Sequence, residues 1–199
     1  MKKTQYLLVL VSMFMASACV SSRLRTSVVE GYQGPISEKK VHISIEALPK
    51  FKYMLESVFA KELKKGFEQR DLTVSQIILN KPESETIQKL NEKVIFNTDA
   101  DYILRVSQID AGLASLMITP PSLNSINTFT PATYSFKEYT YFELQFVDRQ
   151  TSFVIWTANG ATTRDYRGTS DEQAILKLAE KVIKKLEKDA IIATLNDKQ

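Results

Sequence analysis

The sequence predicts an α+β fold, in which a single mixed sheet of about five strands carries two main helices on one face. The expected order of elements is β-α-β-(α)-β-β-β-α. Segments of apolar and polar alternation, typical of half-buried strands, are interspersed with two long segments of helical apolar periodicity. A hydrophobic fraction of 44% is enough for a packed core in a chain of 199 residues. The length suits one domain, which we expect over residues 40–192, and no internal repeat is present.

The first half of this domain alternates strands and helices. Val41 to Glu46 has valine or isoleucine at every second position, which predicts a strand. From Pro49 to Gln69 apolar residues recur at helical spacing, and proline suits the first turn of a helix. Three further elements are expected: a strand at 72–79, a weaker helix at 83–93 with Ile87 and Leu90 on one side, and a strand at 100–109.

The second half predicts a hairpin and a closing helix. Residues 139–147 alternate, Asp148 to Thr151 supply a turn, and residues 153–158 return as the partner strand. The last helix begins after Thr169, where Ser170 and Gln173 form a capping box.

The N-terminal residues predict export and lipidation. Residues 1–18 combine a cationic start, an apolar stretch and a small-residue end, which is the layout of a signal peptide. Cys19, the only cysteine, follows at once. This segment resembles the lipobox of bacterial lipoproteins, although Ala16 stands where leucine is usual. The resemblance implies that Cys19 carries covalent lipid, including palmitate, and two or more acyl chains give stable anchoring.

The residues on either side of the domain predict irregular segments. Residues 19–39 are expected to be a lipidated N-terminus and a flexible tether, because small and polar residues dominate and Gly31 to Pro35 breaks any regular element. Residues 193–199 are expected to be a C-terminal tail.

Two alternatives to the lipid anchor stay open. Residues 4–22 carry no charge and approach the roughly 20 apolar residues of a membrane span, but polar residues dilute them. Ordinary secretion after Ala18 would leave a lone thiol, which invites intermolecular pairing. The lipoprotein resemblance also implies a location: Val20, not aspartate, follows the cysteine, which favours the outer membrane over the inner membrane.

Charge and composition argue against nucleic-acid binding, zinc binding and Ser-His-Asp catalysis. Cleavage after residue 18 leaves 24 basic and 23 acidic residues, too even a balance for nucleic-acid binding. His42 is the only histidine and is expected to face solvent, so neither a zinc site nor a Ser-His-Asp site has support. Asp101, Asp110 and Asp148 stand at strand ends, where carboxylates usually cap turns. We therefore expect no enzyme, no metal and no cofactor beyond the lipid on Cys19.

The stretch from Ala111 to Phe136 contains no charged residue. It includes three prolines and is expected to be a long irregular loop between two strands. Its apolar content argues against simple disorder. The loop therefore either packs on the core or buries itself against a protein partner, another copy or lipid. The residues expected to make that contact are Leu116, Met117, Ile118, Leu123, Ile126 and Phe129.

Two tyrosines extend this candidate surface. Tyr139 and Tyr141 fall on the face of their strand opposite Phe142 and Phe146. If helices cover the phenylalanine face, the tyrosines are exposed, and exposed aromatic residues are enriched at interfaces. The alternative is an aromatic pair that only stabilises the sheet. The lysines of the last helix pose a similar choice between a solvated, ion-paired face and attraction to anionic lipid.

A wider resemblance rests on two runs, Ala100–Val106 and Phe142–Thr151, the second leading to Trp156. They resemble small bacterial periplasmic lipoproteins, including auxiliary lipoproteins of ABC-type transport systems and the CsgG/TolB-N-like group. The resemblance implies a non-enzymatic accessory or assembly component of a transport or secretion complex in the cell envelope. Such a protein would face the periplasm from the outer membrane and bind an envelope protein or its own copies. The alternative is a carrier of lipid or lipopolysaccharide.

Overall fold

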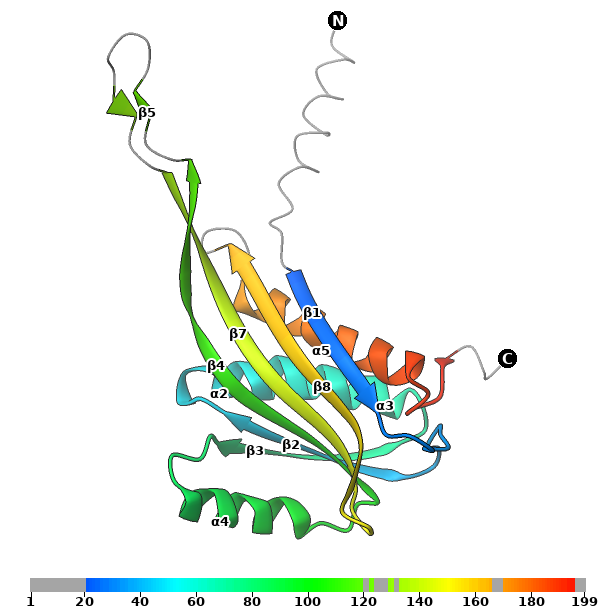
Figure 1. Cartoon of the computed structure of the whole chain (residues 1–199). Coiled ribbons are helices and arrows are strands. Elements are labelled where there is room, and N and C mark those ends of the chain that lie inside the picture. Colours follow the sequence, from blue (N-terminus) through cyan, green and yellow to red (C-terminus); the bar gives the residue numbers. More distant parts are fainter. Residues whose placement is uncertain (1–20, 120–121, 124–128, 131–132, 166–169, 196–199) are drawn as a thin grey trace, which may run out of the picture.

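The computed structural model describes residues 21–119, 122–123, 129–130, 133–165 and 170–195, with the backbone alone for 116–119, 122–123, 129–130, 133–136 and 164–165. Six strands form one mixed sheet in the spatial order β1-β8-β7-β4-β2-β3 (Figure 1). β2 is parallel to β3 and β4, and the other neighbours are antiparallel. The strands are β1 Ser21–Val28, β2 Lys40–Ala47, β3 Thr73–Asn80, β4 Tyr102–Thr119, β7 Thr133–Asp148 and β8 Phe153–Asp165, and a short pair joins β5 Ser122–Leu123 to β6 Phe129–Thr130.

Helices cover both faces of this sheet. A continuous helical run after β2 and the C-terminal helix α5 lie on one face, as expected for the two main helices, and α4 lies on the other (Figure 1). Ser170 caps α5 as predicted, because its hydroxyl accepts a hydrogen bond from the Gln173 backbone N–H at 3.3 Å. The helical segments are η1 Pro49–Phe51, α2 Lys52–Met54, the π-helical η2 Leu55–Ala60, α3 Lys61–Glu68, α4 Glu85–Phe96 and α5 Asp171–Lys188.

The main core lies between the sheet and the first helical layer. Phe59 stacks on Phe142 with ring centroids 6.1 Å apart. α3 approaches α5 closely at Gly66, where a methyl group would lie 2.7 Å from the Ile183 Cγ1. A second, smaller cluster beneath α4 contains Ile95, Ile103 and Val147. The sheet is therefore covered on both faces at the interior strands β2 and β4.

The flexible tether expected at residues 19–39 is wrong for the segment that forms an edge strand. Ser21 to Val28 form β1, an edge strand that pairs with β8 over all eight residues. Leu24 is buried against the sheet, and the Lys181 ammonium of α5 donates a hydrogen bond to the Ser22 carbonyl. Further along, Ile36 is buried and forms a bridge with Ile192. β1 has the composition of a tether, because small and polar residues dominate it. Backbone pairing with β8 and the buried Leu24 side chain hold it in the sheet.

The long irregular loop expected at residues 111–136 is wrong for both of its ends. β4 continues to Thr119 and β7 begins at Thr133, so half of the uncharged stretch belongs to one antiparallel hairpin. Its register runs from the Tyr102–Asp148 pair to the Thr119–Thr133 pair, with irregularities after Gln108 and after Met117.

The helix expected at residues 83–93 is present as α4, with a different buried side. Ile87 and Leu90 are 39% and 58% exposed, whereas Asn91 and Ile95 are buried. The polar Asn91 faces inward because it donates hydrogen bonds to the Glu46 carboxylate and the Asn80 carbonyl, at 2.9 and 3.1 Å. A hydrogen-bonded amide thus occupies a position that periodicity assigns to an apolar residue.

Candidate functional site

The β4–β7 hairpin extends beyond the rest of the sheet. β8 accompanies β7 only as far as the Lys137–Asp165 pair, and β2 leaves β4 at Ser107. Beyond that point, residues 115–119 and 133–136 pair only with each other among the described residues. We call these two segments the outer hairpin. Figure 1 shows it projecting from the body as a two-stranded ribbon.

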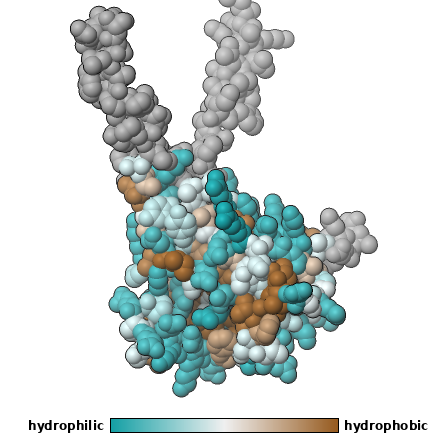
Figure 2. All heavy atoms as spheres, in the orientation of Figure 1, coloured by the Kyte–Doolittle hydropathy of each residue, from teal (hydrophilic) through white to brown (hydrophobic). Residues whose placement is uncertain are grey.

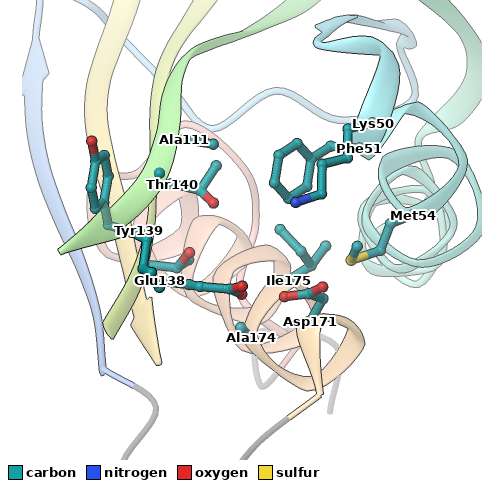
Figure 3. Close-up of a pocket in the computed structure, with 13 residues that line it drawn as sticks. Lys50, Phe51, Met54, Ala111, Glu138, Tyr139, Thr140, Asp171, Ala174 and Ile175 are labelled. Atoms are coloured by element: carbon teal, nitrogen blue, oxygen red, sulfur yellow. The ribbon is translucent and has the colours of Figure 1, made fainter. Parts of the chain in front are cut away.

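A pocket of about 180 Å³ lies where the hairpin leaves the body (Figure 3). Phe51 and Met54 line it from the first helical run, Ile175 from α5, and Leu113 from β4. Leu113 is 53% exposed and pairs in the register with Glu138, whose carboxylate also lines the pocket. Lys50 of η1 and Asp171 of α5 also line it, so the pocket combines apolar and charged side chains. It is smaller than the roughly 300–1,000 Å³ typical of ligand sites.

The two predicted tyrosines lie on the open face of the sheet, as the alternation indicates. Tyr141 is 46% exposed, whereas the neighbouring Phe142 is buried in the core. The rings of Tyr139 and Tyr141 are tilted, with centroids 5.2 Å apart. The Tyr139 ring lies over Gly112, where a methyl group would come within 2.6 Å of the phenol oxygen. The Asp110 carboxylate beside it raises the pKa of Tyr139.

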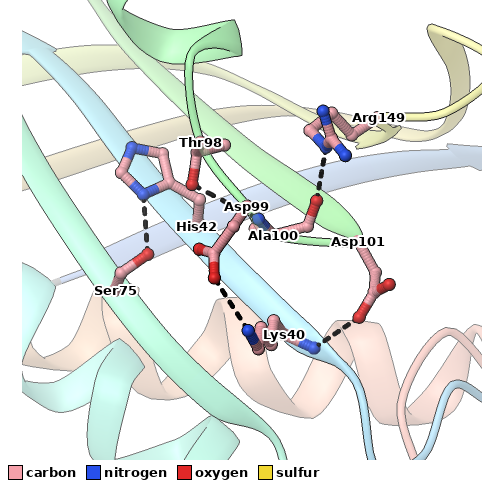
Figure 4. Close-up of polar contacts among 8 residues, drawn as sticks. All are labelled: Lys40, His42, Ser75, Thr98, Asp99, Ala100, Asp101 and Arg149. Carbon is pink, nitrogen blue, oxygen red and sulfur yellow. Dashed lines mark hydrogen bonds and ion pairs between the residues drawn. The ribbon is translucent and has the colours of Figure 1, made fainter.

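The expectation that His42 faces solvent is wrong. Its side chain is only 8% exposed, on the face of β2 that α4 covers. The His42 Nδ1 lies 2.8 Å from the Ser75 Oγ, and its Nε2 has no hydrogen-bond partner among the described residues (Figure 4). Burial lowers the pKa of His42, so the imidazole is neutral at physiological pH. The geometry suits a packed strand residue and supplies no catalytic base.

Two of the three acidic residues expected at strand ends, Asp101 and Asp148, hold a strand start and a turn as predicted, whereas Asp110 lies within β4. Asp101 accepts a hydrogen bond from the Lys40 backbone N–H at 2.9 Å (Figure 4). Asp148 accepts from the N–H groups of Gln150 and Thr151, at 2.9 and 3.1 Å. Asp99 forms a 2.7 Å ion pair with Lys40, and this contact lowers the pKa of Asp99. These carboxylates are committed to structure.

A buried carboxylate that the sequence does not reveal is Glu46. It is on the same face of β2 as His42. Asn91 donates a hydrogen bond to the Glu46 Oε1 and Ser107 donates one to its Oε2, both at 2.9 Å. A pocket of about 340 Å³ beside it is lined by Arg105 and Glu143, among others. Simple alternation marks Glu46 as a solvent-facing residue, because no local signal shows that α4 covers this face. With both oxygens paired, Glu46 links β2, β4 and α4.

Five of the remaining predicted site residues lie in described strands, either in the outer hairpin or in the short β5–β6 pair. Leu116, Met117 and Ile118 belong to β4, Leu123 to β5 and Phe129 to β6 by backbone, and their side chains lie outside the description. Cys19 and Ile126 lie outside the described residues altogether. The role of all these residues in partner contact, and of Cys19 in lipidation, stays a prediction.

The described residues contain neither a candidate metal site nor a candidate membrane-spanning helix. No group of three or more histidine, cysteine, aspartate or glutamate side chains within them could hold a metal ion. In the same part of the chain, no helix combines the length and apolar content that crossing a membrane requires.

The open face of the sheet carries a charged feature that the sequence analysis missed. Arg23 and Arg25 of β1 point to the same side as Tyr141 of β7, because alternate strand residues share a face. Together they line a groove of about 540 Å³ over β1, β8 and β7. Figure 2 shows that hydrophilic side chains dominate the body in this view, with a few hydrophobic areas between them. The sequence does not single out these arginines, because residues 19–39 have the composition of a flexible tether.

Comparison with known proteins yields structural likenesses only. No model of a known protein family matches the chain, and no curated protein sequence matches it either. Similar solved structures include the PelC dodecamer from Paraburkholderia phytofirmans, with 15% identity and a TM-score of 0.46 over 86% of this chain and 99% of that one. A minor lipoprotein from Acinetobacter baumannii has 15% identity and a TM-score of 0.41, covering 78% and 98%. Lipoprotein GNA1162 from Neisseria meningitidis has 11% identity and a TM-score of 0.41, covering 75% and 99%.

Proposed function

We propose that this protein is a lipid-anchored, non-enzymatic accessory subunit of a cell-envelope complex. In this proposal Cys19 carries the lipid after removal of residues 1–18, and the domain faces the periplasm from the outer membrane. The outer hairpin is its docking surface for a protein partner. The observation that carries the proposal is the projection of an uncharged two-stranded ribbon from an otherwise conventional α+β body.

The physical argument concerns the stability of the outer hairpin. An isolated two-stranded ribbon is marginally stable in water, because it lacks a third strand or a packed face. The stretch from Ala111 to Phe136 has no charge to solvate it. Leu113 at the base of the ribbon is 53% exposed, and exposed apolar surface commonly marks an interaction site. A partner that covers the ribbon would supply the missing packing.

The anchor restricts where this partner lies. Antiparallel register sets Ser21 opposite Thr163, and Lys137 opposite Asp165, so β1 begins at the end of the sheet from which the hairpin projects (Figure 1). Only Val20 separates Cys19 from Ser21, a span of about 7 Å in extended chain. Lipid on Cys19 would hold this end of the sheet at the bilayer. The proposed partner is therefore a protein embedded in or attached to the same membrane, which includes further copies of this chain.

The lipid-carrier alternative has less support. An acyl chain needs a long apolar cavity, whereas the pocket beneath the hairpin holds about 180 Å³ and carries the Glu138 and Asp171 carboxylates. Charged groups in such a cavity oppose acyl-chain burial, because they would lose hydration without gaining a partner in the lipid.

Cross-linking in living cells tests the proposal. A photo-reactive amino acid replaces Leu113 at the base of the outer hairpin, Ser115 within it, or Gln150 in the β7–β8 turn as the control. We expect one discrete protein adduct from the first two positions and none from Gln150. In the same cells, Leu116→Ser with Ile118→Ser should lower the adduct yield at least about fivefold, the effect of losing an interface anchor.

Three results would contradict this function. Adducts that are equally abundant at Gln150 would remove the specificity of the hairpin. Native mass spectrometry of the membrane-extracted protein that shows a monomer with bound phospholipid would favour the carrier. A mature N-terminus without acyl chains, or an unchanged membrane fraction for Cys19→Ser, would remove the anchor.

A further inference from the structure

We propose that a basic collar around the start of β1 binds the phosphates of anionic phospholipid headgroups. The inference rests on the proposed anchor for its setting and adds a second, independent contact with the bilayer. The collar consists of cationic side chains on both faces of the sheet: Arg23, Arg25, Lys177, Lys181 and Lys184.

The arginines supply the open-face half of the collar. Both are exposed, and neither has an ion pair among the described residues. Between them and Tyr141 lie only small residues of β8, Gly160 and Ala161, which leaves the groove of about 540 Å³. The groove has no carboxylate among its described lining residues, and Asn159 and Thr163 add amide and hydroxyl groups that can donate hydrogen bonds.

Nearby acids leave this half of the collar positive. In the register across the sheet, one row runs from Arg23 through Ala161 and Tyr141 to Asp110. A second row runs from Arg25 through Asn159 to Glu143. Two strand spacings separate Arg25 from Glu143, which is roughly 10 Å and close to the screening length in physiological salt. Lys137 also lines the groove, but it stands opposite Asp165, so the argument rests on the two arginines.

The lysines supply the other half, on the helical face. Lys177, Lys181 and Lys184 line a hollow of about 400 Å³ together with Ser21 and Ser22. Glu180 is the one acid among its described lining residues. Lys181 holds the strand itself, through a hydrogen bond to the Ser22 carbonyl. Cations therefore flank the first residues of β1 on both faces.

Position identifies the anion. Arginine binds phosphate oxygens in a bidentate manner, and an array of exposed cations suits several phosphates better than one deep site. The collar surrounds the residues that directly follow Cys19, so an acylated chain would hold it at headgroup level. Each basic residue near an anionic surface strengthens attachment, and the attraction fades within a Debye length. A collar at this end, and not elsewhere on the sheet, fits lipid phosphates.

The test uses the full-length protein extracted from membranes and reconstituted into vesicles. The vesicles contain phosphatidylcholine alone or an equal mixture with phosphatidylglycerol, and a photo-reactive phenylalanine replaces Tyr141 in the groove. Mass spectrometry of the adducts should show enrichment of phosphatidylglycerol over phosphatidylcholine. Arg23→Gln with Arg25→Gln should reduce this enrichment by about fivefold for each arginine removed. Arg105→Gln, on the same face but at the other end of the sheet, is the matched control and should leave the enrichment unchanged.

Several outcomes would overturn the collar. One is equal labelling of the two lipids, and another is an enrichment that survives loss of both arginines. If inorganic phosphate displaces the lipid and also binds the lipid-free protein with the same affinity, the groove is a site for free phosphate. If the photo-reactive group labels only a protein, the groove is a site for a protein partner. The anchor is judged separately, by the mass of the mature N-terminus. Arginine-dependent enrichment with an unmodified Cys19 would support the collar and contradict the anchor. Acylation of Cys19 without enrichment would support the anchor and contradict the collar.

Discussion

At the scale of single residues, burial beneath α4 decides how His42 and Glu46 behave. Both lie on the face of β2 that alternates away from the main core, and both are nonetheless shielded from solvent. Glu46 has two hydrogen-bond donors for its two oxygens. His42 has one partner, Ser75, and no described acceptor for a second N–H. The site therefore accommodates a carboxylate and a neutral imidazole, and it disfavours an imidazolium.

This arrangement predicts an acid-sensitive fold. Burial lowers the pKa of His42 below the 6.5 of the unfolded chain. Between these values the unfolded state binds more protons than the folded state, so stability falls as the pH drops below about 6.5. Each unit of pKa difference corresponds to about 1.4 kcal/mol. Urea unfolding at about pH 7 and pH 5 should show a larger loss for the wild type than for His42→Asn, whose amide can still bond Ser75. Equal losses would refute the assignment.

At the scale of elements, the sequence predicts those whose signals are local. The helical run after Pro49, the Ser170 cap of α5 and the turn at Asp148 all follow from spacing and side-chain hydrogen bonds within a few residues. β1 could not be predicted in this way. Its only buried apolar side chain is Leu24, and its pairing partner, β8, lies more than a hundred residues away in the chain. The same limit applies to α4, since Asn91 finds its partner on β2.

β1 therefore gives an element-scale prediction. The Leu24 side chain packs over Gly160, where a methyl group would lie 3.1 Å from the leucine Cδ1. Leu24→Ala should destabilise the protein by about 2 kcal/mol or more, because it removes a buried side chain and leaves a cavity. Ser27→Ala, at an exposed position of the same strand, should change stability by less than about 0.5 kcal/mol. Thermal or urea unfolding measures both. Equal stability of the two variants would support the prediction that residues 19–39 only tether the domain.

At the scale of the whole molecule, the α+β class and its single mixed sheet could be predicted, because strand and helix periodicities accumulate over many residues. The shape of the candidate site could not. An uncharged stretch with prolines has the composition of a loop, and only long-range pairing shows that β4 and β7 run on beyond their neighbours. The collar likewise depends on register, since Arg23 and Lys181 meet only through the placement of β1. Three separate features, the start of β1, the collar and the outer hairpin, thereby gather at one end.

This gathering predicts how the body stands on the bilayer. From Thr163 to the turn at Gln150, β8 spans more than ten residues, about 35–40 Å of strand. With lipid on Cys19 and β1 locked to β8, Thr163 should lie near the headgroups and Gln150 far from them. A spin label at each position, in separate variants with Cys19 acylated, reports its proximity to paramagnetic headgroup lipids. We expect strong relaxation at Thr163 and little at Gln150. A flexible tether would give weak and similar relaxation at both, and stronger relaxation at Gln150 would place the hairpin away from the membrane and reject the proposed docking geometry.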